Sequence, residues 1–279
     1  MKIFKTKFAI REFLSTVRSQ KIKIGLVPTM GALHDGHLSL VAQSKANCVI
    51  TIVSIFVNPT QFNNSDDLKK YPKPLEKDIQ LLENAGCDIL FSPEVDEMYS
   101  ETEDWGYEVG PMSNILEGKF RPGHYKGVTQ IVFKLFDLIK PDSAFFGQKD
   151  YQQFLVISKM SQDLNLNIDL IACPIIREAD GLAMSSRNIR LSASERNKSL
   201  ALFKSLEFIR TNFHQLPIDE LLDRANLLFE KDDHVSLEYL KICDMLTLEE
   251  IHSKKKQKAI ALIACMIGET RLIDNMILS

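Results

Sequence analysis

The sequence has no marked excess of charge of either sign and no long apolar run, and both absences limit what it can encode. Its 34 Lys and Arg residues nearly balance 37 Asp and Glu residues, which leaves a net charge of -3. A large nucleic-acid surface normally appears as a basic excess, so no nucleic-acid partner is expected. No stretch approaches the ~18 uninterrupted apolar residues that a membrane span needs. Residues 1–10 alternate lysine with apolar side chains and lack the apolar core of a signal peptide.

Cysteine is also scarce, and its spacing excludes the usual disulfide and zinc frameworks. The five cysteines are Cys48, Cys87, Cys173, Cys243 and Cys265. They are odd in number and far apart, and no pair has zinc-site or redox spacing. Most lie within apolar runs. We therefore expect buried, reduced thiols in a cytoplasmic protein with no membrane association.

Strand-like apolar segments alternate with helix-like segments through the first two thirds of the chain. The expected strands are residues 21–27, 49–57, 88–91, 143–146 and 168–173, and the expected helices are residues 37–47, 74–85, 128–139 and 151–164. This rhythm predicts an α/β fold with a Rossmann-like, doubly wound parallel sheet. Such sheets bind ligands beyond the carboxyl ends of their strands, so the chemistry should follow the strands.

The pattern changes near residue 177, which indicates a second, smaller domain. A chain of 279 residues lies near the size at which one core divides into two. Residues 192–213 and 218–229 have the pattern of amphipathic helices, and β-rich runs follow at 235–243 and 258–278 with a short helical piece between them. We expect a Rossmann-like domain over residues 1–176 and a C-terminal α+β domain over residues 177–279.

The first motif with chemical potential is Pro-Thr-Met-Gly-Ala-Leu-His-Asp-Gly-His at residues 28–37. It follows an expected strand and opens an expected helix, whose free N–H groups favour an anion. Gly31 would let backbone approach a ligand, and His34 and His37 fall on one helix face. Two imidazoles there can stabilise charge on phosphate oxygens. A structural pair or a metal site would also give this spacing, but the flanking strand and glycines resemble the HIGH signature of the nucleotidyltransferase superfamily.

The second motif is Met-Ser-Ser-Arg-Asn at residues 184–188. Ser185, Ser186 and Arg187 suit a triphosphate, because a guanidinium binds oxygens in a bidentate manner and stays charged. The alternative is an ordinary surface loop whose serine caps the next helix. The same superfamily carries a KMSKS-type loop here, but this sequence lacks the first lysine of that loop.

The third motif, Phe-Gly-Gln-Lys-Asp-Tyr-Gln-Gln at residues 146–153, can supply the missing cation. Lys149 could neutralise phosphate charge, Gly147 could admit an adenosine, and Asp150 could accept a hydrogen bond from a ribose hydroxyl. A helix start capped by Asp150 is the structural alternative, and both can hold at once.

Two further motifs suggest recognition of a hydroxyl- and carboxylate-bearing substrate. Gln61, in Asn-Pro-Thr-Gln-Phe at residues 58–62, follows the longest apolar strand, and Gln153 lies one turn into the later helix. A neutral amide can both donate and accept hydrogen bonds. A basic loop at residues 121–128 could contact substrate or could only position the following helix.

Taken together, these five blocks in this order resemble the pantoate–β-alanine ligase (pantothenate synthetase) family over residues 24–191. The resemblance implies a Rossmann-like domain with a lid domain, a homodimer, and use of ATP with Mg²⁺ to join pantoate to β-alanine through pantoyl adenylate. Carried over by position, His37 would act as general acid with His34, Lys149 and Arg187 stabilising charge. The ATP site would comprise Met30, Gly31, His34, His37, Gly147, Gln148, Lys149, Asp150, the backbone of Ile176, Met184, Ser185, Ser186 and Arg187.

The resemblance also assigns the other substrates and leaves some positions open. Gln61 and Gln153 would bind pantoate, and Gln61 would also border β-alanine. Gln148 departs from the glutamate that the family often has, and Asp78 is a weaker candidate near pantoate or metal. The alternative functions are a nucleotidyltransferase of another cofactor pathway, which has no reason to carry the two glutamine blocks, and a non-catalytic nucleotide-binding regulator.

Overall fold

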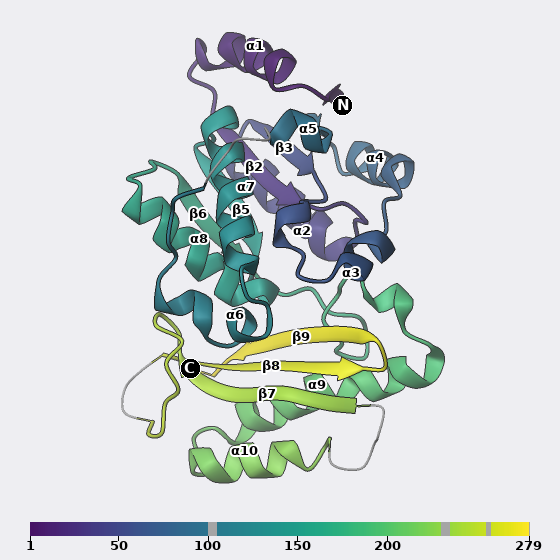
Figure 1. Cartoon of the computed structure of the whole chain (residues 1–279), viewed down its shortest axis with the longest axis vertical. Coiled ribbons are helices and arrows are strands. Elements are labelled where there is room, and N and C mark those ends of the chain that lie inside the picture. The colour runs from purple at the N-terminus through teal and green to yellow at the C-terminus, as the bar shows by residue number, and fades with distance from the viewer. Residues whose placement is uncertain (100–104, 230–234, 255–257, 279) are drawn as a thin grey trace. The chain divides into compact units, whose positions relative to one another are not determined.

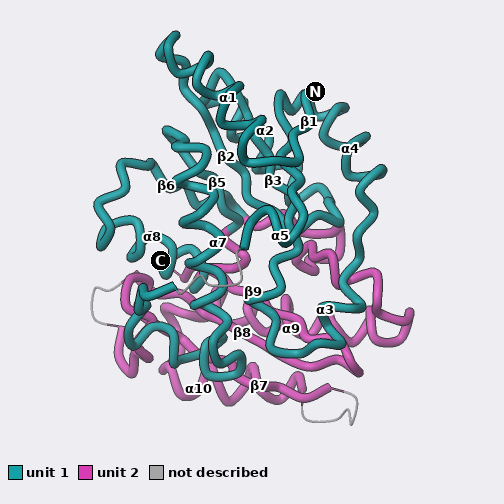
Figure 2. Tube along the Cα trace, turned by 45° about the horizontal axis from the view of Figure 1, so that its top comes forward, with its two compact units in different colours: residues 1–147, 152–174 teal, residues 148–151, 175–279 magenta. Residues whose placement is uncertain are grey.

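The computed structural model describes residues 1–99, 105–229, 235–254 and 258–278, which form two compact units (Figure 2). Unit 1 comprises Met1–Gly147 and Gln152–Pro174, and unit 2 comprises Gln148–Tyr151 and Ile175–Ser279. The longer segment of the second unit begins at Ile175. The unit also takes in Gln148–Tyr151, a segment that the sequence placed in the first domain.

Unit 1 is built on a six-stranded parallel sheet with strand order β1-β4-β3-β2-β5-β6 (Figure 1), which confirms the predicted fold class. Its strands are β1 (Lys2–Phe4), β2 (Ile24–Thr29), β3 (Ile50–Ile55), β4 (Ile89–Phe91), β5 (Ser143–Gly147) and β6 (Asp169–Cys173). From β2, the strands β3 and β4 are added in turn on one side of the sheet, and β5 and β6 are added in turn on the other side. The order therefore reverses between β2 and β5, the point where open α/β sheets bind ligands.

The helices of unit 1 include all four that the sequence predicts, together with several that it does not. The helices are α1 (Lys7–Arg18), α2 (Asp35–Asn47), α3 (Ser65–Lys70), α4 (Leu75–Asn84), α5 (Val95–Met98), α6 (Glu117–Phe120), α7 (His124–Ile139) and α8 (Tyr151–Asp163), with short 3-10 turns η1 (Pro59–Gln61) and η2 (Pro111–Asn114). Tyr151, the first residue of α8, is grouped with unit 2. Strand β1 and helix α1 were not predicted. Strand β1 pairs with β4, which lies far along the chain, so the residues near β1 do not reveal the pairing.

Strand alternation divides the core of unit 1 into two layers. Ile24, Leu26 and Ile52 point to the face covered by α1 and α7, whereas Val27 and Val53 point to the face covered by α2 and α4. A side chain at Gly25 would place its Cβ 2.2 Å from the Ser44 hydroxyl. Glycine at this position therefore lets α2 lie close against the sheet.

Unit 2 contains a three-stranded antiparallel sheet, ordered β7-β8-β9, with two helices packed on it. Its elements are η3 (Gln148–Asp150), η4 (Asn188–Arg190), α9 (Ala193–Asn212), α10 (Ile218–Asn226), β7 (Val235–Asp244), β8 (Ala259–Ile267) and β9 (Thr270–Ile277). The run at 258–278 is split into two strands by Gly268, whose φ is +54°. Ser192 and Glu195 form a capping box that starts α9.

The prediction of a short helix between β7 and β8 is wrong for residues 245–254, which the structure describes. After β7 the chain turns, because the Asp244 carboxylate accepts hydrogen bonds from the backbone N–H groups of Leu246 and Thr247. This Asx-type turn competes with a helix for the same backbone donors.

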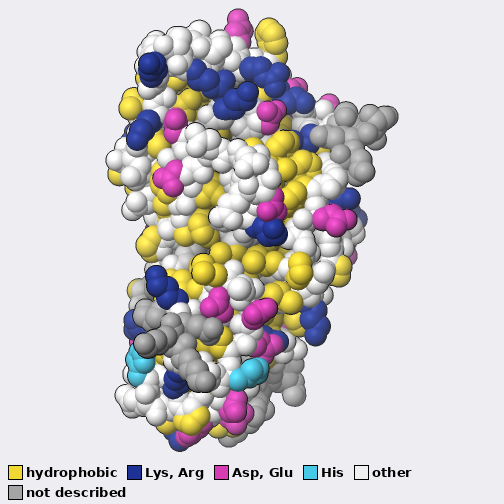
Figure 3. Space-filling view, turned by 90° about the vertical axis from the view of Figure 1, so that its left-hand side faces the viewer, with side chains coloured by type: hydrophobic (Ala, Val, Ile, Leu, Met, Phe, Trp, Pro, Cys, Tyr) yellow, Lys and Arg dark blue, Asp and Glu magenta, His cyan; other side chains and the backbone are white. Residues whose placement is uncertain are grey.

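All five cysteines are free, and all but Cys48 are buried. Burial raises the pKa of Cys243 and of Cys265 to about 12, so these thiols are unreactive. No helix within the described residues is long and apolar enough to cross a membrane. On the face shown in Figure 3, apolar, acidic and basic side chains are intermixed, and lysines and arginines gather at the end that carries α1.

Candidate active site

The turn that follows β2 is held in a left-handed conformation that the sequence supplies with glycine. Gly31 and Ala32 have φ values of +77° and +51°. A Cβ at Gly31 would lie 2.9 Å from the Asp78 carboxylate, so both conformation and space require glycine. The Thr29 hydroxyl donates to Ser54 O at 2.8 Å and accepts from Gly31 N at 3.1 Å. The start of α2 is therefore reached through a rigid turn.

Asp78, on α4, fixes Ala32 and Leu33, which follow Gly31 in the turn. Its side chain is 1% exposed, and its two oxygens accept hydrogen bonds of 2.8 Å from Ala32 N and Leu33 N. Burial raises the pKa of Asp78, while these two hydrogen bonds and the charge of Lys77 oppose the shift. Asp78 therefore acts on the loop that leads to the two histidines.

Asp78→Ala should lower the free energy of unfolding by about 2 kcal/mol, because two backbone N–H groups lose their acceptor and only part of this is offset by removing a buried carboxylate. Denaturant unfolding measures the change. Glu76→Ala is the control, since Glu76 is exposed in the same helical turn and should change stability by less than about 0.5 kcal/mol. Equal stability of the two variants would contradict the role of Asp78.

His34 and His37 lie together at the start of α2, as their spacing predicts. His34 is the N-cap, and its Nδ1 accepts from Gly36 N at 3.1 Å. His37 Nδ1 accepts from His34 N at 3.4 Å, and the two rings are 4.1 Å apart. Both Nδ1 atoms therefore face backbone N–H groups at the helix start, and a neutral ring in this arrangement holds its proton on Nε2.

Gln61, in η1 after β3, is oriented by its neighbours and is 8% exposed. Its Oε1 accepts from Asn58 Nδ2 at 3.1 Å, and its Nε2 lies 3.1 Å from the sulfur of Met30. The structure therefore brings Gln61 beside the residue that precedes Gly31. Asn58, which sequence analysis did not assign, also accepts from Tyr99 OH at 2.7 Å.

Residues of the basic segment 121–128 pack against η1, and a contact of this segment with substrate remains a prediction. A Cβ at Gly127 would lie 2.5 Å from Thr60 O, so glycine lets α7 pack directly against η1. Asn58 Nδ2 donates to Gly127 O at 3.0 Å, and His124 Nδ1 lies 2.9 Å from Gln61 O. Residues from α7 thus hold both ends of the Asn58–Gln61 turn.

Two neighbouring glutamines of α8 have different surroundings. Gln152 is buried, donates to Met112 O and Ile115 O at 2.8 and 2.9 Å, and accepts from Glu117 N at 3.0 Å. Its amide therefore anchors the η2–α6 segment. Gln153 is half-buried on the same helix, and its pantoate role remains a prediction.

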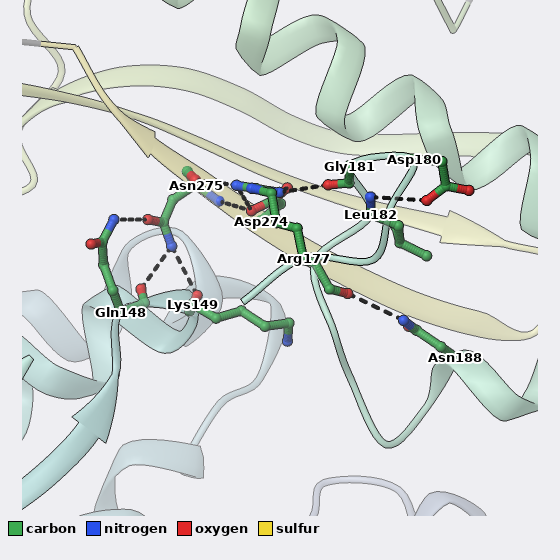
Figure 4. A network of polar contacts seen from close by, with 10 residues as sticks. Gln148, Lys149, Arg177, Asp180, Gly181, Leu182, Asn188, Asp274 and Asn275 are labelled. Atoms are coloured by element: carbon green, nitrogen blue, oxygen red, sulfur yellow. Dashed lines mark hydrogen bonds and ion pairs between the residues drawn. The ribbon is translucent and has the colours of Figure 1, made fainter. Parts of the chain in front are cut away.

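In unit 2, the segment Gln148–Asp150 is held by Asn275 from β9 (Figure 4). Asn275 Nδ2 donates to Gln148 O and to Lys149 O, both at 2.9 Å, and Asn275 Oδ1 accepts from Gln148 Nε2 at 3.2 Å. The side chain of Gln148, where the family often has glutamate, thus binds protein in this structure. The Lys149 side chain extends away from Asn275.

The Met184–Arg187 segment follows a small hairpin. Arg177 and Ala183 form an antiparallel bridge, and Met184 N donates to Ile176 O at 3.0 Å. Asn188 Nδ2 donates to Glu178 Oε1 and Ala183 O at 3.0 and 3.2 Å. The Ser185 hydroxyl accepts from Arg187 N at 3.2 Å just before η4, and the longer helix α9 is capped by Ser192. Ser185, Ser186 and Arg187 are half-buried.

Sequence analysis missed Asp274 and Asn275, although a signal was present. They are two adjacent polar residues inside the apolar run Leu272 to Ile277, where alternation allows only one to face the core. Both are buried. Adjacent buried polar residues in a strand indicate a hydrogen-bonded network, but the sequence does not name their partners.

The hydrogen bonds of Asp78 go to the protein backbone, and its place near pantoate or metal remains a prediction. Both of its oxygens already accept backbone hydrogen bonds, and the described residues contain no group of three His, Cys, Asp or Glu side chains that could hold a metal ion. Mg²⁺ commonly keeps several waters and binds through substrate phosphates. A Mg²⁺ that accompanies ATP does not require a protein cage.

The sheet, the left-handed turn after β2 and the histidines at the start of α2 define a Rossmann-like α/β protein of the HIGH-motif type. The model of the family described as pantoate-beta-alanine ligase matches residues 2–277. This chain belongs to the pantoate–β-alanine ligase family.

Individual relatives agree with this assignment. The pantothenate synthetase of Bacteroides thetaiotaomicron is 43% identical, over 99% of this chain and 98% of that protein. A crystal structure of pantothenate synthetase from Thermus thermophilus matches with a TM-score of 0.94 and 38% identity, over 99% of both chains. The Francisella tularensis ligase, crystallised with β,γ-ATP and β-alanine, matches with a TM-score of 0.82 and 35% identity, over 99% of this chain and 97% of that one. The predicted enzyme class is confirmed.

Proposed function

We propose that the ligation of pantoate to β-alanine runs in two steps at the residues described above. The pantoate carboxylate attacks the α-phosphorus of ATP, giving pantoyl adenylate and pyrophosphate. The β-alanine amine then attacks the acyl carbon, giving pantothenate and AMP. The observation that carries the proposal is the family match over residues 2–277, which contains all five motif blocks.

In this proposal the two histidines act on the phosphates in the first step. Their Nε2–H donors face charge that builds as pyrophosphate leaves. His37 is the general acid, which gives up its Nε2 proton from the imidazolium form after the 3.4 Å contact of Nδ1 with His34 N is lost, and His34 is the second donor. Met30 and Gly31 border the same nucleotide, since the rigid turn places their backbone at the helix start.

Lys149 and Arg187 supply the positive charge, and their neighbours complete the ATP site. A Cβ at Gly147 would meet no described atom within 4 Å, and its φ is not left-handed. Neither packing within the protein nor backbone conformation explains a glycine at this position. We therefore propose that the missing side chain leaves space for the bound adenosine. The remaining ATP contacts are Gln148, Asp150, the backbone of Ile176, Met184, Ser185 and Ser186.

Gln61 and Gln153 bind pantoate, and Gln61 also borders β-alanine. Pantoate presents two hydroxyls and a carboxylate beside a gem-dimethyl group, which amides above an apolar surface would match. The hydrogen bond from Asn58 Nδ2 to Gln61 Oε1 fixes which end of the Gln61 amide faces the ligand.

Gln61→Ala should raise the KM for pantoate by roughly 10- to 100-fold, because a lost hydrogen bond to a buried polar group costs about 1–3 kcal/mol. The affinity for ATP, measured by calorimetry without pantoate, should stay within about threefold of the unaltered protein. Gln80→Ala, an exposed glutamine on α4, is the control. Loss of ATP binding with an unchanged pantoate KM would place Gln61 in the nucleotide site instead.

Three further features belong to the proposal. Mg²⁺ enters with the ATP phosphates and supplies charge neutralisation there. The smaller unit acts as a lid that excludes water from the mixed anhydride, which would otherwise hydrolyse. The enzyme works as a homodimer in the cytoplasm.

The test is exchange of labelled pyrophosphate into ATP with β-alanine absent. Exchange should occur with pantoate and stop without it, because adenylation precedes amine attack. A strict requirement for β-alanine would overturn the two-step order. Release of AMP, rather than its retention in the product, separates this reaction from that of a cofactor nucleotidyltransferase.

A further inference from the structure

The side chain of Asn275 binds the two backbone carbonyls on either side of the Lys149 Cα, those of Gln148 and Lys149. It is 1% exposed, and its two amide hydrogens go to consecutive carbonyls while its oxygen accepts from the Gln148 amide. A primary amide has two N–H donors and one acceptor oxygen on a single planar group. Aspartate offers no donor at neutral pH and serine offers one, so this set of contacts specifies an amide of this length.

The backbone of Asn275 is fixed in turn by a buried ion pair. Asp274, 3% exposed, contacts Arg177 through both oxygens, at 2.6 and 3.0 Å. Asp274 Oδ1 also accepts from Asn275 N at 2.7 Å, and Arg177 donates to Asn275 O at 3.2 Å. Arg177 further donates to Gly181 O at 3.0 Å and lies over the ring of Phe203. A side chain at Gly181 would collide with that ring, so the hairpin packs closely there.

These contacts join three segments that are far apart in the sequence (Figure 4). The end of β9 holds the Lys149 segment on one side, and through Arg177 it holds the hairpin that leads to residues 184–187 on the other. All three segments belong to unit 2. Lys149 follows β5 directly in the chain, yet its hydrogen bonds tie it to β9.

We propose that Asn275 is a positioning residue for Lys149, with the Arg177–Asp274 pair holding Asn275 in place. Asn275 acts through the backbone carbonyls of residues 148 and 149, and it sets the direction in which the Lys149 side chain leaves the turn. This inference rests on the proposed role of Lys149 at the phosphates of ATP.

The experiment is a double-mutant cycle on pantoate-dependent ATP–pyrophosphate exchange with Asn275→Ala, Lys149→Ala and the combined variant. Asn275→Ala alone should lower the rate by up to about 100-fold, the size of loss that a displacement of ~1 Å can cause. In the Lys149→Ala background the same substitution should change the rate less than about threefold, because the side chain that it positions is gone. Lys149→Ala keeps the backbone carbonyls that Asn275 binds. One single variant therefore removes the positioned ammonium, and the other removes the amide that positions it.

Leu272→Ala is the matched control for simple destabilisation. Leu272 lies on the same strand, and its side chain is buried in the core of unit 2. An apolar side chain takes no part in the hydrogen-bond network of Asn275, Asp274 and Arg177. It should lower the thermal unfolding midpoint but leave the exchange rate within about threefold at a temperature where every variant is folded. Asn275→Ser is the second variant if Asn275→Ala does not fold, and with one donor left it should lose less activity.

The outcomes separate this inference from the proposed function. Equal losses from the Asn275 substitution with and without Lys149 would overturn the positioning role while leaving Lys149 as a phosphate ligand. Full activity of Asn275→Ala beside a strongly impaired Lys149→Ala would overturn it as well. Full activity of Lys149→Ala would overturn the role of Lys149 itself, and the inference with it.

Discussion

His37→Ala should reduce the rate of pantoate adenylation by roughly 100- to 1,000-fold, because a lost donor to developing charge typically costs about 3 kcal/mol of barrier. The donor is Nε2–H, which carries the proton because Nδ1 accepts from His34 N. That accepting bond is 3.4 Å long and contributes little to the cap. Stability should therefore fall by less than about 1 kcal/mol. Single-turnover formation of pyrophosphate, followed beside thermal unfolding, measures both effects.

Two controls separate the chemistry from the capping of α2. His252→Ala removes an exposed histidine from unit 2 and should change neither quantity. His34→Asn keeps a strong N-cap acceptor for Gly36 N while removing the imidazole. It should keep stability and lose activity. A His37→Ala rate within a few-fold of the unaltered protein would refute the role of His37.

Lys149→Ala should lower kcat/KM for ATP by about 100-fold or more, because the proposed function places this cation at the phosphates in the transition state. Pantoate binding should change little, since its recognition is assigned to neutral amides. The variant should fold normally, because Asn275 binds the backbone carbonyl of Lys149, which the substitution keeps. Steady-state kinetics with each substrate varied in turn give the two constants.

Lys159→Ala is the control, because it removes a lysine from α8, the helix that follows Lys149 in the chain. Its ammonium makes an exposed ion pair with Asp163 at 2.8 Å, which contributes little in water. Lys149→Arg restores charge without the shape of lysine and should recover only part of the activity. Unchanged ATP kinetics in Lys149→Ala would mean that another cation takes the place of the missing lysine in the Met-Ser-Ser-Arg loop.

The sequence was most informative where a local pattern decides the structure. The strands at 24–29 and 50–55 follow from short apolar runs, and the helix that begins near His34 follows from the glycines and the pattern after it. Strand β1 was missed because three residues carry little pattern, and their pairing with β4 lies far along the chain. The helix expected after β7 failed because one side chain, Asp244, takes the backbone donors that a helix needs.

By itself, the sequence determined the Rossmann-like class, the family and the residue types of the site, because strand period, turn glycines and ordered motifs are local properties. The tertiary structure decided what holds those residues. It placed the Asp78 carboxylate under the Gly31 turn, Asn58 against Gln61, and Asn275 on the Lys149 segment. The Asp78 and Asn275 side chains bind backbone groups far along the chain, and Asn58 also binds Gly127 O of α7. A buried hydrogen bond depends on where two segments meet, and only the folded chain brings them together.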